Sequence, residues 1–213
     1  MPLSSTHKHQ CLPLKRALDI IFSLSVLILV SPLFLVIAMI IKATSKGNAI
    51  YYQIRIGRGG THFRCYKFRT MYQNADSILD EILATNPEKR EEWNNTHKLK
   101  NDPRVTPIGH FLRKSSLDEL PQFWNVLKGD LSVVGPRPVV KEEINRHFGH
   151  KAEKIFSIRP GITGLWQISG RSDTSYSKRI ALDEYYVENR TLLKDLKIIA
   201  LTIPSIISKK GAY

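Results

Sequence analysis

One uninterrupted apolar run dominates the pattern of hydrophobic and polar positions along the chain. Residues 20–41 read IIFSLSVLILVSPLFLVIAMII, 22 residues without a charged side chain. As an α-helix this run would be roughly 33 Å long at about 1.5 Å per residue, enough for a bilayer core of about 30 Å. The run is too long for the apolar region of a secretory signal, and no small-residue cleavage site follows it. The pattern therefore predicts a membrane-bound protein.

The run could span the bilayer or enter and leave on the same side. Pro32, preceded by Ser31, stands near its middle and removes the backbone hydrogen bond to the carbonyl of Ile28, so a kink is expected. Positive charge on both flanks suits a hairpin whose two ends lie in the cytoplasm. An ordinary kinked transmembrane helix explains these residues equally well. The flanking basic residues include Lys8, Lys15, Arg16, Lys42, Lys46 and the arginines up to Arg69.

The rest of the pattern predicts a mainly α-helical protein with a small β-hairpin. Two β-prone segments within residues 49–69 flank the turn sequence GRGG at 57–60. Residues 73–101 predict two polar helices that meet at Asn86-Pro87, and residues 141–157 predict another surface helix. Near the end, apolar residues recur at helical spacing opposite charged ones, which fits a core-facing helix and a membrane-surface helix equally. The apolar positions are Leu192, Leu196, Ile199, Ile203 and Ile206, and the charged ones are Lys194, Asp195 and Lys197.

Charge and cysteine content narrow the class of protein. The chain has 213 residues, with 32 Lys+Arg against 19 Asp+Glu and a net charge of +13. Such a surface favours nucleic acid, phosphorylated small molecules or an anionic membrane face. Cys11 and Cys65 cannot form a disulfide scaffold, and no zinc-binding spacing is present. The acids Asp76, Asp80 and Glu81 share one helical face, which is typical of a solvated surface rather than a metal site.

Two adjacent acids in the stretch SSLDELPQ (115–122) are the main candidates for chemistry. Ser116 and Glu119 match a helix capping box, and Pro121 indicates that a helix begins close by. The capping reading explains Glu119 but leaves Asp118 without a role. Carboxylates at a helix start among Arg and Lys can hold a divalent metal and a phosphate together, and a carboxylate can also attack phosphorus. The cations nearby in the sequence are Arg104, Arg113, Lys114 and Arg137.

Several stretches, in order, resemble the bacterial sugar transferases, also called monotopic phosphoglycosyl transferases. They are YKFRTM (66–71), DPRVTPIGHFLRKSSLDELPQFWNVLKGDLSVVGPRP (102–138), RPGITGLWQISGR (159–171) and LDEYYVEN (182–189). The second stretch is long and specific. Together with the hydrophobic segment, the resemblance covers nearly the whole chain from about Leu12.

The resemblance implies an enzyme that moves a sugar-1-phosphate from a UDP-sugar onto undecaprenyl phosphate and releases UMP. Asp118 would be the nucleophile on the β-phosphate, Glu119 and Asp118 would hold Mg²⁺, and Lys67 would lie near the phosphates. Arg137 would lie near the nucleotide. Arg113 and Arg69 are further candidates for substrate binding. Gln167 and Arg171 are candidates too, with a structural role in the RPGITG loop as an equal alternative.

The resemblance also implies the membrane topology and the domain organisation. The family's hydrophobic segment is a re-entrant helix broken at a Ser-Pro pair, which matches Ser31-Pro32 and favours the dip. We therefore expect a polar N-terminus (1–14), a re-entrant membrane helix (15–45) and a cytoplasmic catalytic domain (46–213) that ends in amphipathic membrane-surface helices. The expected location is the cytoplasmic face of the bacterial inner membrane. Larger relatives add N-terminal spans and a further domain, so this chain looks like the catalytic module alone.

Some questions stay open at the level of sequence. A membrane-anchored, basic nucleic-acid-binding or scaffold protein is the main alternative, but no recognised nucleic-acid motif is present, so we expect no nucleic-acid partner. Association into a homo-oligomer and the role of residues 73–101 are not fixed by the sequence. The overall look, including the KGAY ending, favours galactose as the sugar, with glucose next and N-acetylated sugars behind. Relatives of this kind begin exopolysaccharide, capsule or O-antigen repeats.

Overall fold

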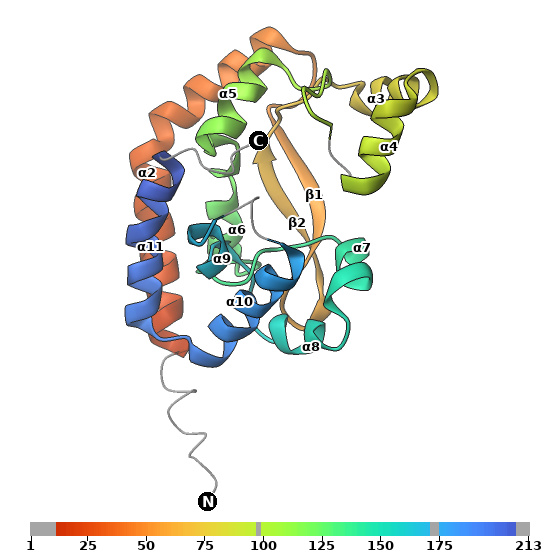
Figure 1. Cartoon of the computed structure of the whole chain (residues 1–213). Coiled ribbons are helices and arrows are strands. Elements are labelled where there is room, and N and C mark those ends of the chain that lie inside the picture. The colour runs from red at the N-terminus through yellow and green to blue at the C-terminus, as the bar shows by residue number, and fades with distance from the viewer. Residues whose placement is uncertain (1–11, 97–98, 171–174, 208–213) are drawn as a thin grey trace, which may run out of the picture.

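A single long helix runs along one side of the computed structural model, which describes residues 12–96, 99–170 and 175–207 (Figure 1). This helix, α2 (Leu12–Thr44), contains the whole apolar run. Within the described ranges it is the one helix that is long and apolar enough, by length and composition, to cross a membrane. Many of its apolar side chains face outward, among them Ile21, Leu29, Leu35 and Met39, each more than 60% exposed. The predicted hydrophobic segment is therefore a helix with a broad exposed apolar surface.

The helix α2 continues through Pro32 because Ser31 replaces the missing hydrogen bond. Pro32 has no amide hydrogen to donate to the carbonyl of Ile28. The Ser31 hydroxyl donates to that carbonyl instead, at 2.8 Å. Figure 1 shows the last turns of α2 inclined to the earlier ones, so the predicted kink appears as a bend within one helix.

A two-stranded antiparallel hairpin follows, as predicted for residues 49–69. Strand β1 (Ile50–Ile56) pairs with β2 (His62–Phe68), with Tyr51 opposite Lys67 and Arg55 opposite Phe63. The turn between them contains a 3₁₀ element, Arg58–Gly60, in which Gly59 has φ 67°. Side chains alternate between the two faces of a strand, so Arg55 and Lys67 project from the same face of the hairpin.

The remaining elements are several short helices, the longer helices α10 and α11, and one short parallel strand pair. The predicted helix pair at 73–101 is confirmed as α3 and α4, which Figure 1 shows projecting from the main body. The predicted helix at 141–157 is instead three short pieces, since Gly149 has φ 51° and interrupts it. Strands β3 and β4 pair in parallel. The bounds are α3 Ala75–Thr85, α4 Pro87–Thr96, α5 Pro107–Ser115, α6 Gln122–Lys128, β3 Ser132–Val134, α7 Lys141–Glu143, a π-helical turn Ile144–Phe148, α8 Lys151–Ile155, β4 Gly161–Thr163, α9 Leu165–Ile168, α10 Tyr176–Asn189 and α11 Leu192–Ile207.

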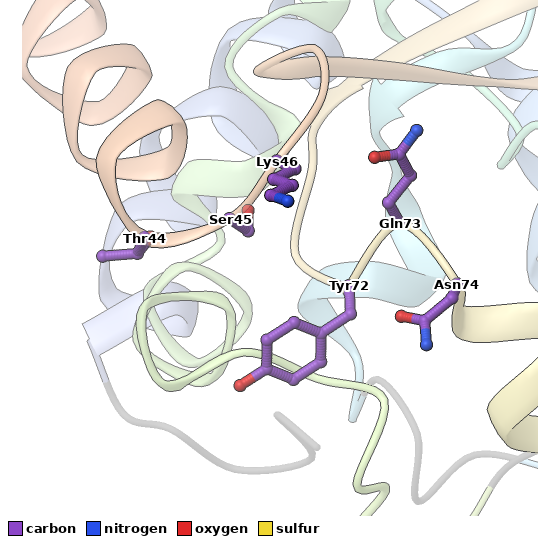
Figure 2. Close-up of a pocket in the computed structure, with 6 residues that line it drawn as sticks. All are labelled: Thr44, Ser45, Lys46, Tyr72, Gln73 and Asn74. Carbon is purple, nitrogen blue, oxygen red and sulfur yellow. The ribbon is translucent and has the colours of Figure 1, made fainter.

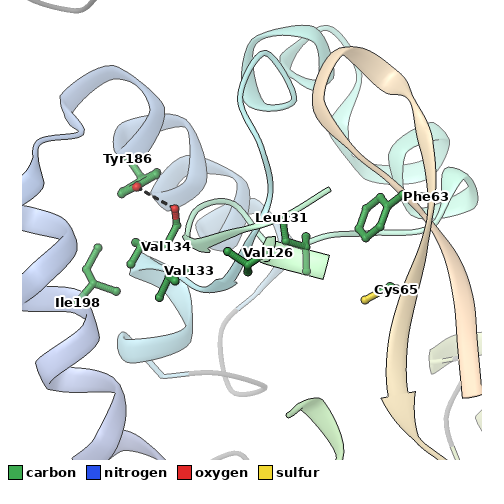
Figure 3. Packing of buried hydrophobic residues seen from close by; sticks show 8 residues of the cluster. All are labelled: Phe63, Cys65, Val126, Leu131, Val133, Val134, Tyr186 and Ile198. Atoms are coloured by element: carbon green, nitrogen blue, oxygen red, sulfur yellow. Dashed lines mark hydrogen bonds between the residues drawn. The ribbon is translucent and has the colours of Figure 1, made fainter. Parts of the chain in front are cut away.

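The central hydrophobic cluster joins the hairpin to the helices that carry the site (Figure 3). It contains buried residues of β2, α6, β3, α10 and α11, and Cys65 lies within it as a free thiol. Burial of such side chains contributes about 1.5–3 kcal/mol each. The members are Phe63, Cys65, Val126, Leu131, Val133, Val134, Tyr186 and Ile198.

Helix α11 exposes part of its predicted apolar stripe and buries one of the charged residues expected opposite it. Leu196 and Ile203 are exposed, whereas Asp195 is only 1% exposed. Ile199 packs against the central cluster, so the stripe has one edge on the core and one edge exposed, and Asp195, expected on the solvated side, is buried. Asp195 is buried because Lys15 and Tyr186 both contact its carboxylate in the interior of the protein.

Candidate active site

Asp118 and Glu119 lie on a tight turn between two helices. Helix α5 ends at Ser115, its C-cap residue Ser116 has a left-handed φ of 57°, and the 3₁₀ turn Leu117–Glu119 follows at once. Helix α6 begins after Pro121, as the proline predicts. The capping-box reading is wrong, because Ser116 makes no side-chain capping bond and Glu119 instead reaches Lys67 on the hairpin.

Lys67 brings the two acids together around one ammonium group. Its Nζ lies 2.7 Å from Glu119 Oε1 and 3.4 Å from Asp118 Oδ2. Asp118 is buried, and the side chains of Lys67 and Glu119 are about three-quarters buried. Pairing with β1 holds β2 in an extended conformation. This conformation directs the Lys67 side chain toward the turn that carries the acids. Three of the predicted catalytic residues therefore meet at one point.

The two carboxyl groups have opposite pKa shifts. Burial opposes ionisation of Glu119, but Lys67 and Arg137 outweigh it and lower the pKa of Glu119 to about 2. Burial raises the pKa of Asp118, and the charge of Glu119 adds to that effect, while Lys67 and Arg113 oppose it. Adjacent acids with pKa values driven apart are typical of groups with different catalytic roles.

Arg137 extends the site from Glu119 toward an aromatic ring. Its Nη1 lies 3.9 Å from Glu119 Oε1. The Arg137 guanidinium carbon lies 5.8 Å from the centre of the Trp166 ring, and that of Arg179 lies 4.7 Å from the same ring. Cations over an aromatic face are attracted by its electron density. The predicted nucleotide-side residue therefore lies between the acidic pair and a cationic, aromatic region.

A second charged cluster borders this region and was not predicted. Glu143 pairs with Arg55 at 3.2 Å and with Arg179 at 3.5 Å, and it accepts a hydrogen bond from the Tyr176 hydroxyl at 3.0 Å. The alternation of the hairpin could have identified Arg55, since it shares a face with Lys67. The other three come together only through tertiary folding, so no local pattern marks them.

Several buried polar groups around Arg137 have no hydrogen-bond partner among the residues that the structure describes. They include Nε and Nη2 of Arg179, Nε1 of Trp166 and both amide atoms of Gln167. Burial raises the pKa of Asp183 to about 7, although Arg179 and the nearby Arg137 amide favour its charged form. Buried polar atoms normally have partners. This arrangement fits a polar ligand, or water, held against the described part of α9 and α10.

The other predicted substrate residues have different surroundings. Arg113 lies close enough to Asp118 that the charge of each favours ionisation of the other. The Nε of Arg113 also donates to Thr70 Oγ1 at 3.0 Å. Arg69 instead donates to the carbonyl and hydroxyl of Ser45, at 3.0 and 2.9 Å. The structure thus brings Arg113 to the acidic pair but not Arg69. Arg171 lies outside the described residues.

A pocket of about 570 Å³ lies near Arg69, at the C-terminal end of α2, and not at the acidic pair. Figure 2 shows the six lining residues, none of which carries a carboxylate. The residues that line this pocket therefore cannot supply a carboxylate nucleophile. The lining residues are Thr44, Ser45, Lys46, Tyr72, Gln73 and Asn74.

The acidic pair has the composition expected for a magnesium site that is completed by substrate. Among the described residues, no group of three His, Cys, Asp or Glu could hold a metal ion, and the acids of α3 form no such group. Mg²⁺ at phosphate sites commonly uses one or two carboxylates together with substrate phosphates. Asp118 and Glu119 supply two carboxylates, so these residues fit that ion.

Comparison with known proteins places the chain among enzymes of polysaccharide synthesis. It is 48% identical to "Exopolysaccharide production protein ExoY" of Sinorhizobium fredii, over 93% of this chain and 88% of that protein. It is also 48% identical to "Undecaprenyl-phosphate galactose phosphotransferase" of Salmonella typhimurium, over 94% of this chain and 42% of that protein. A "UDP-glucose:undecaprenyl-phosphate glucose-1-phosphate transferase" of Klebsiella pneumoniae is 44% identical, over 93% of this chain and 41% of that protein.

These relatives fall into two lengths. The chain spans most of the ExoY protein and less than half of the two phosphotransferases. The model of the family "Bacterial sugar transferase" matches residues 10–209, almost the whole chain. With the acidic pair, Lys67 and Arg137 assembled in one site, the chain belongs to the bacterial sugar transferase family.

Proposed function

We propose that the chain transfers a hexose-1-phosphate from a UDP-sugar to undecaprenyl phosphate and releases UMP, as the first membrane step of extracellular polysaccharide synthesis. The observation that carries the proposal is the buried Asp118 beside Glu119, with Lys67 in contact with both. Relatives named for this reaction cover nearly all of the chain. Galactose is the favoured sugar, since relatives named for galactose or galactosyl transfer are 48%, 47% and 40% identical, whereas two named for glucose are 44% and 38% identical.

In the first half of the proposed reaction, a carboxylate oxygen of Asp118 attacks the β-phosphorus of the UDP-sugar. The bond from that phosphorus to the bridging oxygen breaks, and UMP leaves with the oxygen and the electron pair. The product is a sugar phosphate joined to Asp118 as an acyl-phosphate. In the second half, an oxygen of the lipid phosphate attacks the same phosphorus and frees the Asp118 carboxylate.

The cations around Asp118 suit the charge that develops in both halves. Lys67 and Arg113 face the carboxylate from the hairpin and from α5. Fixed cations stabilise negative charge on a transferring phosphoryl group, usually the largest demand in this chemistry. Arg137, with Trp166 beneath it, would hold the nucleotide side of the substrate. Asp118 would thus attack from within a preformed cationic frame.

We assign Glu119 and Asp118 as the residues that would hold Mg²⁺. The lowered pKa of Glu119 keeps this carboxylate ionised across the physiological range. A bound Mg²⁺ would supply charge neutralisation of the diphosphate. The division of labour is supported by the shifted pKa values, with Glu119 permanently charged and Asp118 the more basic and more nucleophilic oxygen donor.

The contacts of α2 support the re-entrant topology at a cytoplasmic membrane face. Near its start, Arg16 donates to the carbonyls of Val126 and Leu127. Near its end, Ile37 and Ile41 pack with Phe68 of the hairpin. Both ends of one helix therefore contact the same body, and a helix that spanned the bilayer would place its ends on opposite sides.

The test is a panel of UDP-sugars with the purified protein in detergent, with UMP release as the signal. Turnover with undecaprenyl phosphate and one hexose, galactose first, is the expected result. Release of about one UMP per enzyme without lipid would support the covalent route. Absence of UMP release with every UDP-sugar, from a folded protein supplied with Mg²⁺ and lipid, would refute the proposal.

A further inference from the structure

Three side chains place a donor within hydrogen-bond distance of the carbonyl of Val134, three residues before Arg137. The donors are Lys15 Nζ at 3.2 Å, the Tyr186 hydroxyl at 3.1 Å and the Ser132 hydroxyl at 2.9 Å. Figure 3 shows the bond from Tyr186 of α10 to this carbonyl at the end of β3. Of these donors, Lys15 belongs to the first turn of α2, so the membrane helix reaches the strand that leads to the active site.

Lys15 is fixed in place by a buried carboxylate. Its Nζ lies 2.6 Å from Asp195 Oδ2 of α11, and Asp195 Oδ1 accepts the Tyr186 hydroxyl at 2.7 Å. Asp195 is 1% exposed and Tyr186 is 2% exposed. A buried charge is retained only with partners of good geometry. The Lys15 ammonium has enough hydrogens to bond both Asp195 and Val134, whereas the Tyr186 hydroxyl has one hydrogen and donates to one of the two at a time.

Asp19, one turn further along α2, holds the start of the same strand. Its Oδ1 accepts the Val133 amide and the Ser132 hydroxyl, each at 3.0 Å. Asp19 is 2% exposed and lies 3.8 Å from Lys15 Nζ. The helix α2 therefore binds β3 through two neighbouring side chains, and every residue of the strand is contacted directly by one of them.

The connection from β3 to Arg137 is short and stiff. The Gly135 amide donates to the Thr163 carbonyl at 2.9 Å, and the Gly161 amide donates to the Pro136 carbonyl at 2.7 Å. A Cβ on Gly135 would lie 2.7–2.8 Å from backbone atoms of Arg159 and Gly161, so the segments touch. With prolines on both sides of Arg137, φ is fixed at two of the three positions 136–138. A shift of β3 is therefore passed on to Arg137.

We propose that Lys15 and Asp19 are positioning residues for Arg137, so that the seating of α2 sets the geometry of the nucleotide side of the site. The inference rests on the function proposed above, in which Arg137 holds the nucleotide. According to this proposal, the first turns of α2 contribute to catalysis as well as to membrane anchoring. Neither residue touches substrate; both act through β3.

The test compares Lys15→Met with Lys15→Arg, in lipid nanodiscs, by the Kd for UMP and the KM for the UDP-sugar. Lys15→Met should raise both by at least about fivefold, the scale of coupling between residues in one network. Lys15→Arg should restore much of the loss, since it keeps the charge and a donor. Lys42→Met, a matched charge loss in the last turn of α2, should leave both constants unchanged. The KM for lipid phosphate should not change in any of them.

A double-mutant cycle separates positioning from a general loss of stability. In an Arg137→Ala background, Lys15→Met should produce no further rise in the Kd for UMP. If Lys15→Met does not fold, two other variants replace it. Lys15→Met/Asp195→Asn removes both charges of this ion pair, and Tyr186→Phe removes one hydroxyl. Either variant should give the same Arg137-dependent rise in the Kd for UMP. An unchanged Kd in these variants, or an equal rise with and without Arg137, would overturn the inference. A wild-type protein that binds UMP but never releases it from a UDP-sugar would refute the proposed function, while the cycle would still decide the role of Lys15.

Discussion

The Lys67 ammonium lies 2.7 Å from Glu119, a residue that the local sequence presents as a helix cap. This contact removes Glu119 from any capping role and makes it a partner of the hairpin. Since Asp118 accepts the same ammonium at 3.4 Å, the strand β2 controls the electrostatics of both acids. Lys67, Glu119 and Asp118 therefore form one coupled unit, and changing one should alter the ionisation of the others.

Replacing Lys67 with Met should lower kcat by at least about 10²-fold, the usual cost of removing one group that stabilises transition-state charge. It should also shift the acid limb of the pH–rate profile to higher pH. Asp118 attacks only when ionised, so the rate rises with pH through its pKa, and Lys67 is a cation that holds this pKa down. A pH–rate profile of UMP release measures both effects. Lys128→Met, a surface lysine paired with Asp130, is the control and should alter neither.

Glu119→Gln should lose most of the activity and also lower the melting temperature, because Lys67 and Arg137 stabilise the ionised Glu119 carboxylate in the folded protein. The side chain makes no capping bond, so the roughly 1 kcal/mol associated with a cap is not at stake. The Mg²⁺ dependence of the residual rate should weaken, and the acid limb should move to lower pH, because a negative neighbour of Asp118 is gone. A large drop in melting temperature with unchanged specific activity would instead assign Glu119 a structural role.

The sequence was sufficient for those features that depend on local pattern. The hairpin follows from β-prone segments around a glycine turn, and the bend in α2 follows from Pro32. The three-residue strands β3 and β4 could not be predicted, because they are held by the approach of Gly135 to Gly161 across the fold. The burial of Asp195 in α11 could not be predicted either, since it depends on a contact with Lys15 at the other end of the chain.

The same division applies to the site. Asp118, Glu119, Lys67 and Arg137 lie in motifs, and the structure brings them together. The cluster around Glu143 comes from three separate segments that no spacing connects. Sequence motifs therefore identify the acidic pair and its cations, and only tertiary structure identifies the polar region beside Trp166.

The re-entrant topology predicts that both ends of α2 lie in the cytoplasm. In a Cys11→Ser background, cysteines placed at Ser5 and Asn48 should react with an impermeant maleimide only after the cells are opened. Pro32→Leu restores the amide donor to Ile28 and should straighten the helix, which shifts part of the population toward spanning. The readout is labelling at position 5 in intact cells, which should rise in Pro32→Leu. If position 5 alone reacts from outside in the wild-type protein, the helix spans.

The raised pKa of Asp183 predicts that the stability of the protein depends on pH in an unusual way. The pKa of Asp183 is raised to about 7 in the folded protein, against 3.8 for the ordinary group. Between these values the folded state holds a proton that the unfolded state has lost, so this group makes stability fall as pH rises from about 4 to 7. The full difference corresponds to about 4 kcal/mol. Asp183→Asn should remove this slope and raise the melting temperature at pH 8 relative to wild type, with little change at pH 4; an unaltered slope would contradict the assignment.

Asp118 should become covalently attached to the sugar phosphate during turnover. Burial and the charge of Glu119 raise the pKa of Asp118, so the Asp118 carboxylate is the more basic of the pair. Lys67 and Arg113 lie beside it and can bind the phosphoryl group that it attacks. Incubation with the UDP-sugar alone should release about one UMP per enzyme and add the mass of a hexose phosphate to the peptide that contains Asp118. Asp118→Asn keeps the shape but removes the charge, so it should abolish both signals while the melting temperature holds. Asp130→Asn, which changes an acid outside the site, should retain both. If UMP appears only after polyprenyl phosphate is added and no adduct is trapped, the lipid phosphate attacks directly, and Asp118 serves as a metal ligand or a base.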